Sequence, residues 1–336
     1  MTATGHGTIE RTRRRSGDRA DVTDPYMTRY GYAATNWTLR EEEEIRTNRG
    51  MRQATFEERG LSYAGELALS NCRGLLRVLR WNVANNAQFF RITSALLPWF
   101  SQYAIDELPN AEAAREALRE AGALAREHGM RLTFHPNHFV KLASPKPDVV
   151  ERSITDLENH GALCDAMELE RSPYNSINVH IGAHYGDKAA TARRFREHFG
   201  ELSASVRSRL TVENDDKESL WSVPELIEEI HEPVGIPVVY DELHHQFTDR
   251  GLTRKEALTR ATATWDDSGV RPVVHYSEAR RLHQADPTVR PQNHSDYVAG
   301  PIRTWDTGAD VMIEAKAKER ALLEYRRRKG DRRASA

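Results

Sequence analysis

Short apolar runs alternate with longer amphipathic stretches along most of the chain. Each run spans five or six residues rich in β-branched or aromatic side chains, which is typical of buried strands. Eight runs fit this description: residues 29–33, 89–93, 131–135, 177–182, 209–214, 237–241, 272–276 and 310–315. Helical periodicity predicts helices over 56–86, 111–129, 147–167, 190–209, 222–233 and 253–265. Eight strands that alternate with helices predict an α/β fold, a single (β/α)8 TIM barrel of ~250 residues.

The two ends of the chain differ from this central region because both are locally basic. The N-terminal end contains RTRRR and the C-terminal end contains YRRRKGDRR. We therefore predict three parts: a disordered basic N-terminal arm over residues 1–26, the barrel domain over 27–320, and a flexible basic C-terminal tail over 321–336. Basic runs of this kind are most often solvated rather than functional.

Length and composition narrow the class of protein further. A chain of 336 residues that is 39% hydrophobic can bury a substantial core. Two cysteines, Cys72 and Cys164, make neither a disulfide framework nor a CxxC site, and no apolar run approaches the ~20 residues of a membrane span. The first 26 residues also lack the apolar region of a signal peptide. We therefore expect a soluble, cytoplasmic protein that is a monomer with no membrane partner.

Polar side chains collect where the predicted strands end, and those ends meet around one pocket in a barrel. A single histidine after a strand is more often structural, but imidazoles and carboxylates from six consecutive strands would be costly together without a cation. Mixed nitrogen and oxygen ligands without thiolate suit Zn, Mn or Fe. The number of ligands predicts at least two ions, with Glu213 able to bridge them. The candidate ligands are His135, His180, Glu213, Asp241, His244, His275, His294 and Glu314.

Several of these segments also resemble one known family when they are taken in order. The segments are RYGYAATNWTL, HPNHF, VHIGAHYG, VENDD, YDELHH, VVHYSE, NHSDY and DVMIEAKAKE. As an ordered set they resemble the UV damage endonucleases, a family of TIM-barrel DNA repair enzymes. The resemblance extends from about residue 27 to about residue 319.

This resemblance implies an activity, a cofactor and roles for particular residues. The activity is a metal-dependent nick immediately 5′ to cyclobutane pyrimidine dimers and (6-4) photoproducts in double-stranded DNA, which leaves 3′-hydroxyl and 5′-phosphate ends. Mn²⁺ is the implied metal, with two or three ions per chain and Zn²⁺ or Mg²⁺ as alternatives. Glu213 and His244 would be catalytic as well as metal ligands. The resemblance also places Tyr32, Asn36, His138 and Phe139 at the DNA lesion.

The loop after the third strand supports lesion recognition on physical grounds. Phe139 is an apolar group that can enter a weakened base stack, and a damaged step costs less to open than an intact one. Ordinary loop packing is an equally good explanation of this residue. Four cations near strand ends, Arg91, Lys141, Lys188 and Lys316, are candidates for phosphate contacts, or for ordinary solvated charges.

Two positions depart from the family pattern and bear on the number of ions. Val273 stands where many relatives have a lysine, and Ala95 stands where some relatives have a polar side chain. Neither residue can coordinate a cation. We therefore predict that His135, His180 and Glu213 share one ion and that Asp241, His275 and Glu314 hold a second. His244 and His294 are left with a weaker third ion.

Two other classes of protein remain compatible with these residues. A metal-dependent sugar isomerase or epimerase also uses a parallel barrel with His, Glu and Asp ligands, but it needs only a closed pocket for a free sugar. A non-catalytic DNA-binding protein would bind damaged duplex with or without metal. The number of ligands and Phe139 favour a nuclease.

Overall fold

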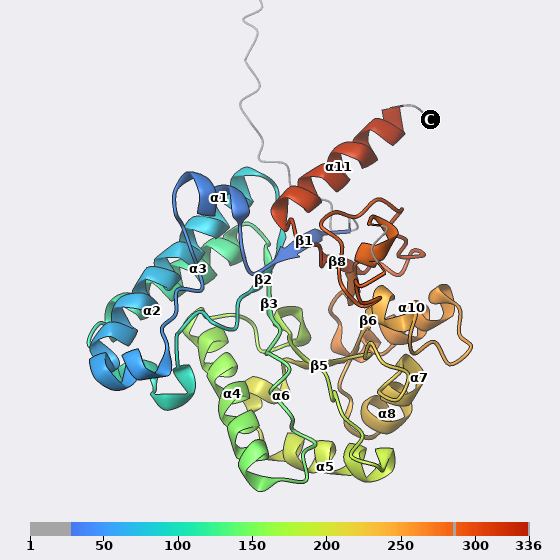
Figure 1. Ribbon diagram of the computed structural model, residues 1–336, viewed down its shortest axis with the longest axis horizontal. Helices are drawn as coiled ribbons and strands as arrows, with labels where there is room; N and C mark the ends of the chain where they lie inside the picture. The colour runs from blue at the N-terminus through green and yellow to red at the C-terminus, as the bar shows by residue number, and fades with distance from the viewer. Residues whose placement is uncertain (1–27, 285–286, 335–336) are drawn as a thin grey trace, which may run out of the picture.

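The computed structural model describes residues 28–284 and 287–334, and it contains a closed barrel of eight parallel strands (Figure 1). The strands follow one another around the barrel in chain order, β1 to β8, and β8 pairs with β1. All eight predicted strands are confirmed, with these bounds: β1 Tyr30–Ala33, β2 Phe89–Ile92, β3 Arg131–Phe134, β4 Ile177–Val179, β5 Leu210–Glu213, β6 Val238–Asp241, β7 Val273–Tyr276 and β8 Asp310–Ile313.

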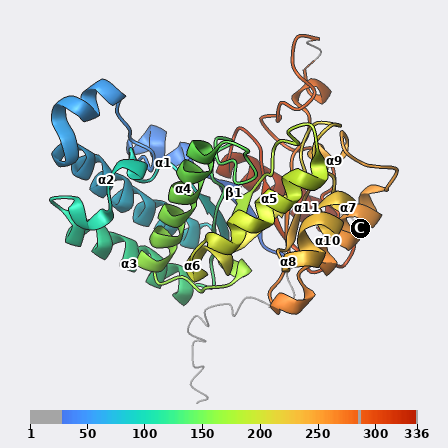
Figure 2. The ribbon, with the colours of Figure 1, turned by 90° about the horizontal axis from the view of Figure 1, so that it is seen from below.

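Helices form an outer layer around the strands (Figure 2). The α-helices are α1 Trp37–Glu42, α2 Gln53–Ala84, α3 Ala111–Glu127, α4 Pro147–Ala166, α5 Lys188–Glu201, α6 Ala204–Arg207, α7 Val223–Leu226, α8 Glu232–Val234, α9 Glu242–His245, α10 Arg254–Ala263 and α11 Glu319–Ala334. A π-helical turn, η4 Ile227–His231, joins α7 to α8, and five short 3-10 turns lie in loops: η1 Phe100–Gln102, η2 Ile105–Glu107, η3 Pro173–Asn175, η5 Asp266–Ser268 and η6 Arg280–Leu282. None of the described helices is both long and apolar enough to cross a membrane.

The helix expected over 190–209 is divided into α5 and α6. Leu202 ends α5 in an extended conformation, and Ser203 then caps α6, since its hydroxyl accepts a hydrogen bond from the amide of Val206. Serine favours this position because its side chain satisfies an amide that has no partner within the helix. The helix expected over 222–233 is continuous, because the backbone stays helical where α7 meets the π-helical turn and where that turn meets α8, and Gly235 ends it at φ +73°.

The predicted C-terminal tail is wrong for the described residues, because 319–334 form helix α11. Leu322 and Tyr325 are buried against the barrel. The Arg326 guanidinium donates to the carbonyl of Asn85 at 3.2 Å, and the Lys329 ammonium lies over the Tyr30 ring. The basic residues of this segment thus fasten α11 near the start of β1. The predicted N-terminal arm over 1–26 lies outside the described residues.

A buried ion network lies at the amino end of the barrel. Arg131, the first residue of β3, is fully buried, and its guanidinium donates to Asp310 at 3.2 Å and to the carbonyl of Arg271 at 2.8 Å. Asp310, the first residue of β8, also accepts from the Arg29 side chain at 3.2 Å. The Arg271 guanidinium lies 3.5 Å from the Asp310 carboxylate and completes the network. This network ties β1, β3 and β8 together at the end of the barrel where the strands begin.

Candidate metal centre

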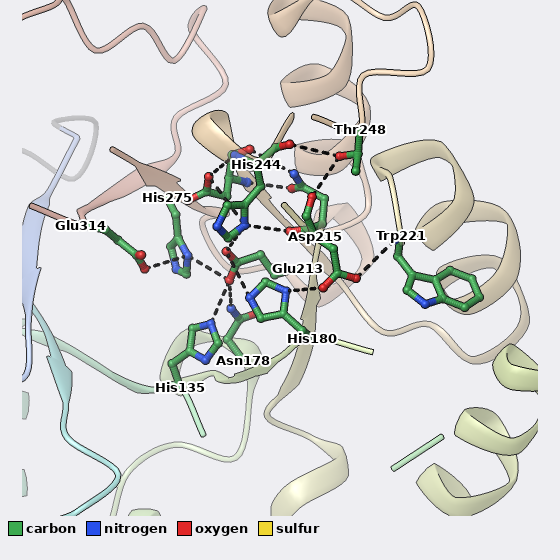
Figure 3. A network of polar contacts seen from close by, with 12 residues as sticks. His135, Asn178, His180, Glu213, Asp215, Trp221, His244, Thr248, His275 and Glu314 are labelled. Atoms are coloured by element: carbon green, nitrogen blue, oxygen red, sulfur yellow. Dashed lines mark hydrogen bonds and ion pairs between the residues drawn. The ribbon is translucent and has the colours of Figure 1, made fainter. Parts of the chain in front are cut away.

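The carboxyl ends of the strands bring the predicted ligands together (Figure 3). In a parallel barrel the last residues of every strand lie around the same mouth. Glu213 and Asp241 are the last residues of β5 and β6, and His275 lies within β7. The others follow strands: His135 after β3, His180 after β4, His244 in α9 after β6, Glu314 after β8, and His294 in the loop between β7 and β8.

Glu213 is the central residue of this cluster, with only 1% of its surface exposed. One carboxylate oxygen, Oε2, lies 3.1 Å from His135 Nε2 and 3.0 Å from His275 Nδ1. The other oxygen, Oε1, lies 3.3 Å from His244 Nδ1 and 3.8 Å from His180 Nε2. Four imidazoles from four strand ends thus surround a single buried carboxylate, which is the geometry expected of a bridging ligand.

Three groups of side chains could each hold a metal ion, since one ligand atom from every member lies within 4.8 Å of the others. The groups are His135–His180–Glu213, Glu213–Asp241–His244 and Asp241–His275–Glu314. The first and last of these are the sets predicted for the first two ions. The remaining group differs from the prediction, because His244 lies with Glu213 and Asp241 rather than with His294. Among the described residues, His294 joins none of the three groups, although its ring centroid lies 6.4 Å from that of His244.

Unsatisfied polar atoms indicate that these residues suit cations. Asp241 Oδ2, His180 Nδ1 and His275 Nδ1 are buried and have no hydrogen-bond partner among the described residues. His275 Nδ1 lies 3.0 Å from Glu213 and 3.2 Å from Glu314, but the angles do not allow hydrogen bonds. Buried polar groups without partners are rare in folded proteins. His180 belongs to one of the three groups, while Asp241 and His275 belong to another. Divalent cations held by these groups would give buried polar groups of this kind a partner, so the residues present fit metal ions.

Main-chain carbonyls hold three of the imidazoles in place. The Nδ1 atoms of His135, His244 and His294 lie 3.0, 3.0 and 2.8 Å from the carbonyls of Pro136, Asn214 and Glu314. An imidazole that donates through Nδ1 has Nε2 free as a metal ligand, and such outer contacts are characteristic of metal-binding histidines. This contact arrangement supports a ligand role for His294 even though it lies outside the three groups.

The charges of the cluster are strongly coupled. Burial acts to raise the pKa of Glu213, but the imidazoles of His275 and His180 outweigh burial and hold it well below its ordinary value. Burial raises the pKa of Asp241, and the carboxylates of Glu213 and Glu314 raise it further. Burial opposes protonation of His244, but Asp241 and Glu213 raise its pKa well above its ordinary value. A metal ion would displace protons from groups whose pKa is raised, such as His244 and Asp241. Metal binding at this cluster would therefore release protons.

Three polar residues at the centre were not predicted from the sequence. Asn178, within β4, donates from its amide to the Glu213 carboxylate. The Asn214 side chain bridges the main chain of Asp241, accepting from its amide at 2.8 Å and donating to its carbonyl at 3.1 Å. Asp215 Oδ1 lies 3.3 Å from His180 Nδ1. The sequence offered two signals for these residues: Asn178 is a polar residue inside an apolar strand, and Asn214 and Asp215 lie in the polar run that follows Glu213.

The two residues predicted to probe a lesion lie together in the loop after β3. Phe139 is the most exposed of the large hydrophobic side chains described, at 74%. The His138 ring packs beside it, with ring centroids 4.1 Å apart. The structure therefore gives no support to the alternative that Phe139 is packed inside the loop, and it leaves the ring accessible to a partner.

Tyr32 and Asn36 were predicted near the lesion, but both are buried inside the protein. The Tyr32 hydroxyl donates to Asn82 of α2 at 2.6 Å and accepts from the Asn36 amide at 3.0 Å. Burial raises the pKa of Tyr32, so the phenol remains protonated. Asn36 also caps α1, since its oxygen accepts from the amide of Leu39 at 2.9 Å. In this structure the two side chains support the segment after β1, and their role at a lesion stays a prediction.

The four candidate phosphate-binding cations lie in different environments. Lys188 forms an ion pair with Glu225 at 2.7 Å, and Arg91 forms one with Glu314. Lys141 donates to the carbonyl of Gly182 at 3.2 Å, and burial lowers its pKa. Lys316 is the exposed member of the four. The first three therefore stabilise the loops around the centre, and of these four only Lys316 presents an exposed side chain.

The two departures from the family pattern also have clear locations. Val273 is buried inside the barrel, where it packs with Phe89, Val239 and Met312. Ala95 is exposed in the turn after β2. Neither the isopropyl group nor the methyl group offers a ligand atom to the centre.

The barrel and its cluster define the class of this protein: a TIM-barrel protein with a candidate centre for several metal ions. Comparison with known proteins assigns the family. The chain belongs to the family described as UV-endonuclease UvdE, whose model matches residues 28–332.

Individual relatives agree with this assignment. UV-damage endonucleases of Neurospora crassa and Schizosaccharomyces pombe are 35% and 33% identical over 285 and 323 residues, covering 81% and 93% of this chain but 42% and 52% of the relatives. The chain thus spans about half the length of these two fungal relatives. The UV DNA damage endonuclease of Bacillus pumilus is 30% identical over 88% of this chain and 92% of its own length.

Solved structures resemble the fold to different extents. The crystal structure of SacUVDE has a TM-score of 0.75 at 29% identity and covers 88% of this chain and 96% of its own. Endonuclease IV from Thermus thermophilus has a TM-score of 0.52 at 15% identity, covering 85% of this chain and 91% of its own. The 3-keto-D-glucoside 4-epimerase YcjR from E. coli has a TM-score of 0.51 at 9% identity, covering 86% and 92%. These last two show a shared fold alone, so the barrel by itself does not separate a nuclease from an epimerase.

Proposed function

We propose that this chain is a metal-dependent DNA repair endonuclease that nicks the damaged strand immediately 5′ to UV photoproducts. Cyclobutane pyrimidine dimers and (6-4) photoproducts are the proposed lesions, and the products carry 3′-hydroxyl and 5′-phosphate ends. The observation that carries the proposal is the cluster of four imidazoles around the buried Glu213 carboxylate at the barrel mouth. Family membership supports the choice of substrate.

The residues of the centre have separate roles in this proposal. Divalent ions held by the three groups would supply an activated water and charge stabilisation at the scissile phosphate. Glu213 belongs to two groups and would bridge two ions. His244 completes one of these groups, while Asn214 fixes the main chain of Asp241. Mn²⁺ is the proposed ion, since the ligands mix nitrogen and oxygen without thiolate, and Zn²⁺ and Mg²⁺ are the alternatives.

The proposed partner is UV-damaged double-stranded DNA inside the cell, bound at the barrel mouth by a monomer. The exposed Phe139 and Lys316 would contact the lesion and the backbone, respectively. Phosphate contacts position a duplex without selecting its sequence, whereas an inserted aromatic ring selects a weakened stack.

A single-lesion duplex tests the proposed cut position. A synthetic duplex with one cyclobutane dimer is labelled on the damaged strand and incubated with the protein and Mn²⁺. We expect one product that ends immediately 5′ to the dimer and that a polymerase can extend from its 3′-hydroxyl. A cut 3′ to the dimer would contradict the proposed position, and an intact strand together with interconversion of free keto-sugars would favour the epimerase alternative instead.

Phe139→Ala is expected to weaken binding to damaged duplex more than binding to undamaged duplex. Stacking between an aromatic ring and a base contributes ~1 to 3 kcal/mol, which corresponds to a ~5- to 150-fold loss of affinity. Binding should be measured on both duplexes with metal-stripped protein, so that the damaged strand is not nicked during the measurement. Leu323→Ala is the matched control, since it removes a partly exposed apolar side chain from α11. Equal losses on both duplexes would show that Phe139 does not recognise the lesion.

Graded dialysis is expected to remove one ion before the others. In the Glu213–Asp241–His244 group only His244 is not shared with another group, so the third ion, beside which His294 lies, has the fewest ligands of its own. Two metals suffice for phosphoester displacement. We therefore expect nicking to persist after the first ion is lost. Elemental analysis should accompany each rate measurement, and simultaneous loss of all ions together with activity would contradict a weaker third site.

A further inference from the structure

Glu278 lies three residues after His275, and its carboxylate accepts hydrogen bonds from several groups at once. The main-chain amides of Ala299 and Gly300 donate to it at 2.9 and 2.7 Å. The Tyr276 hydroxyl donates at 3.0 Å, and His283 Nε2 lies 2.7 Å away. Only 11% of the side chain is exposed. No metal-ligand role was predicted for Glu278, and in the described part of the chain it joins none of the three groups.

These contacts fix one end of the loop that carries His294, residues 293–300. The other end is fixed by main-chain hydrogen bonds: Arg280 donates to Asn293 at 2.6 Å, and Ser295 donates to the carbonyl of Glu278 at 2.8 Å. The loop also contacts the segment after β8, since the main-chain amide of Lys316 donates to the carbonyl of Ser295 at 3.0 Å. Glu278 therefore holds both ends of the loop, through its side chain at 299–300 and through its carbonyl at 295.

The fit around the carboxylate is close and specific. Burial acts to raise the pKa of Glu278, but the amides of Ala299 and Gly300 outweigh burial and lower it. A Cβ atom on Gly300 would lie 3.0 Å from the Tyr276 hydroxyl and 3.2 Å from Glu278 Oε1. The loop thus approaches the carboxylate at a distance that a glycine permits and that a larger residue would increase.

We propose that Glu278 is a positioning residue that holds the 293–300 loop so that His294 reaches the metal centre. The inference rests on the proposed metal centre and adds a residue that acts through His294 rather than on the ion. Within the centre the His294 imidazole contacts Glu314 through Nδ1, which lies 2.8 Å from the carbonyl and 3.7 Å from the carboxylate of that residue. Without the carboxylate, residues 299–300 lose their anchor while the main-chain bonds near 293 and 295 remain. The imidazole is then held less firmly, and the ion that it would bind is retained less well.

Mn²⁺ binding to the full chain, measured by titration calorimetry and elemental analysis without DNA, tests the proposal. Glu278→Ala is expected to lower the affinity for the most weakly bound Mn²⁺ by ~10- to 100-fold. This is the usual effect of losing a contact that orients a metal ligand. The tighter ions should be unchanged. Glu278→Gln should largely restore binding, because its amide oxygen can accept from Ala299 and Gly300 while its NH2 group donates to the other tautomer of His283.

A double-mutant cycle identifies the route of the effect. If Glu278 acts through His294, Glu278→Ala should add little to the loss caused by His294→Ala. Additive losses, or unchanged Mn²⁺ affinity in Glu278→Ala, would overturn the proposal. Gly300→Ala gives an independent variant that keeps the carboxylate but displaces the loop, and it should weaken the same ion. Thermal unfolding of the metal-free variants identifies any general loss of folding. A wild-type chain that binds no Mn²⁺ would instead contradict the proposed function itself.

Discussion

Glu213→Gln is expected to abolish nicking and to weaken Mn²⁺ binding in the same variant. An amide in place of the carboxylate loses the negative charge and the second ligand oxygen at a residue that belongs to two of the three groups. A bound metal contributes several kcal/mol of charge stabilisation in the transition state. A loss of ~4 kcal/mol corresponds to a ~10³-fold slower reaction. Single-turnover nicking of irradiated duplex and elemental analysis of the same preparation measure both effects.

The control for this variant lies in the loop that follows Glu213. Glu218→Gln removes an exposed carboxylate five residues further along and should leave both nicking and metal content unchanged. If Glu213→Gln retains its metal and its rate, Glu213 does not bridge ions and the arrangement of the centre is wrong.

Asp310→Ala is expected to destabilise the fold without changing the metal centre. The substitution leaves the fully buried Arg131 guanidinium without its carboxylate partner and also removes the ion pairs with Arg29 and Arg271. Removing one member of a buried ion pair costs ~3 to 5 kcal/mol because the remaining charge is uncompensated. Equilibrium unfolding in urea should therefore show a lower midpoint, with the same loss in metal-free and metal-loaded protein.

An exposed ion pair provides the comparison. Asp106 pairs with Arg115 at 2.8 Å on the protein surface, where solvent screens the charges. Asp106→Ala should change the urea midpoint little. Equal effects of the two substitutions would show that the buried network does not stabilise the barrel.

The barrel was predictable because its local signals and its topology agree. Each strand is a short run buried on both faces, such as Val238–Asp241, and a helical stretch follows most of them. Helix α11 was not predictable from periodicity, because its many arginines hide the few apolar residues that pack, Leu322 and Tyr325. The break between α5 and α6 depends on one capping serine inside a continuous helical pattern.

The meeting of the candidate ligands at one mouth was predictable for a related reason. Parallel strands end on the same side of a barrel, so residues far apart in sequence must meet there. Contacts that do not follow from the convergence of the strand ends were not predicted. Asp215 gave no signal beyond its acidic neighbours, and Lys188 pairs with Glu225 in a way that depends on how two helices approach each other. Tyr32 lies in a run of three buried residues of β1, but its contact with Asn82 of α2 has no local sequence signal.

The most direct test of the central claim compares four reactions of the purified chain. Irradiated and unirradiated copies of one end-labelled duplex are each incubated with metal-stripped protein, with and without added Mn²⁺. A metal centre that serves lesion cleavage predicts nicks only in the reaction that contains both irradiated duplex and Mn²⁺. Equal nicking of unirradiated duplex, or nicking that survives complete removal of metal, would contradict it.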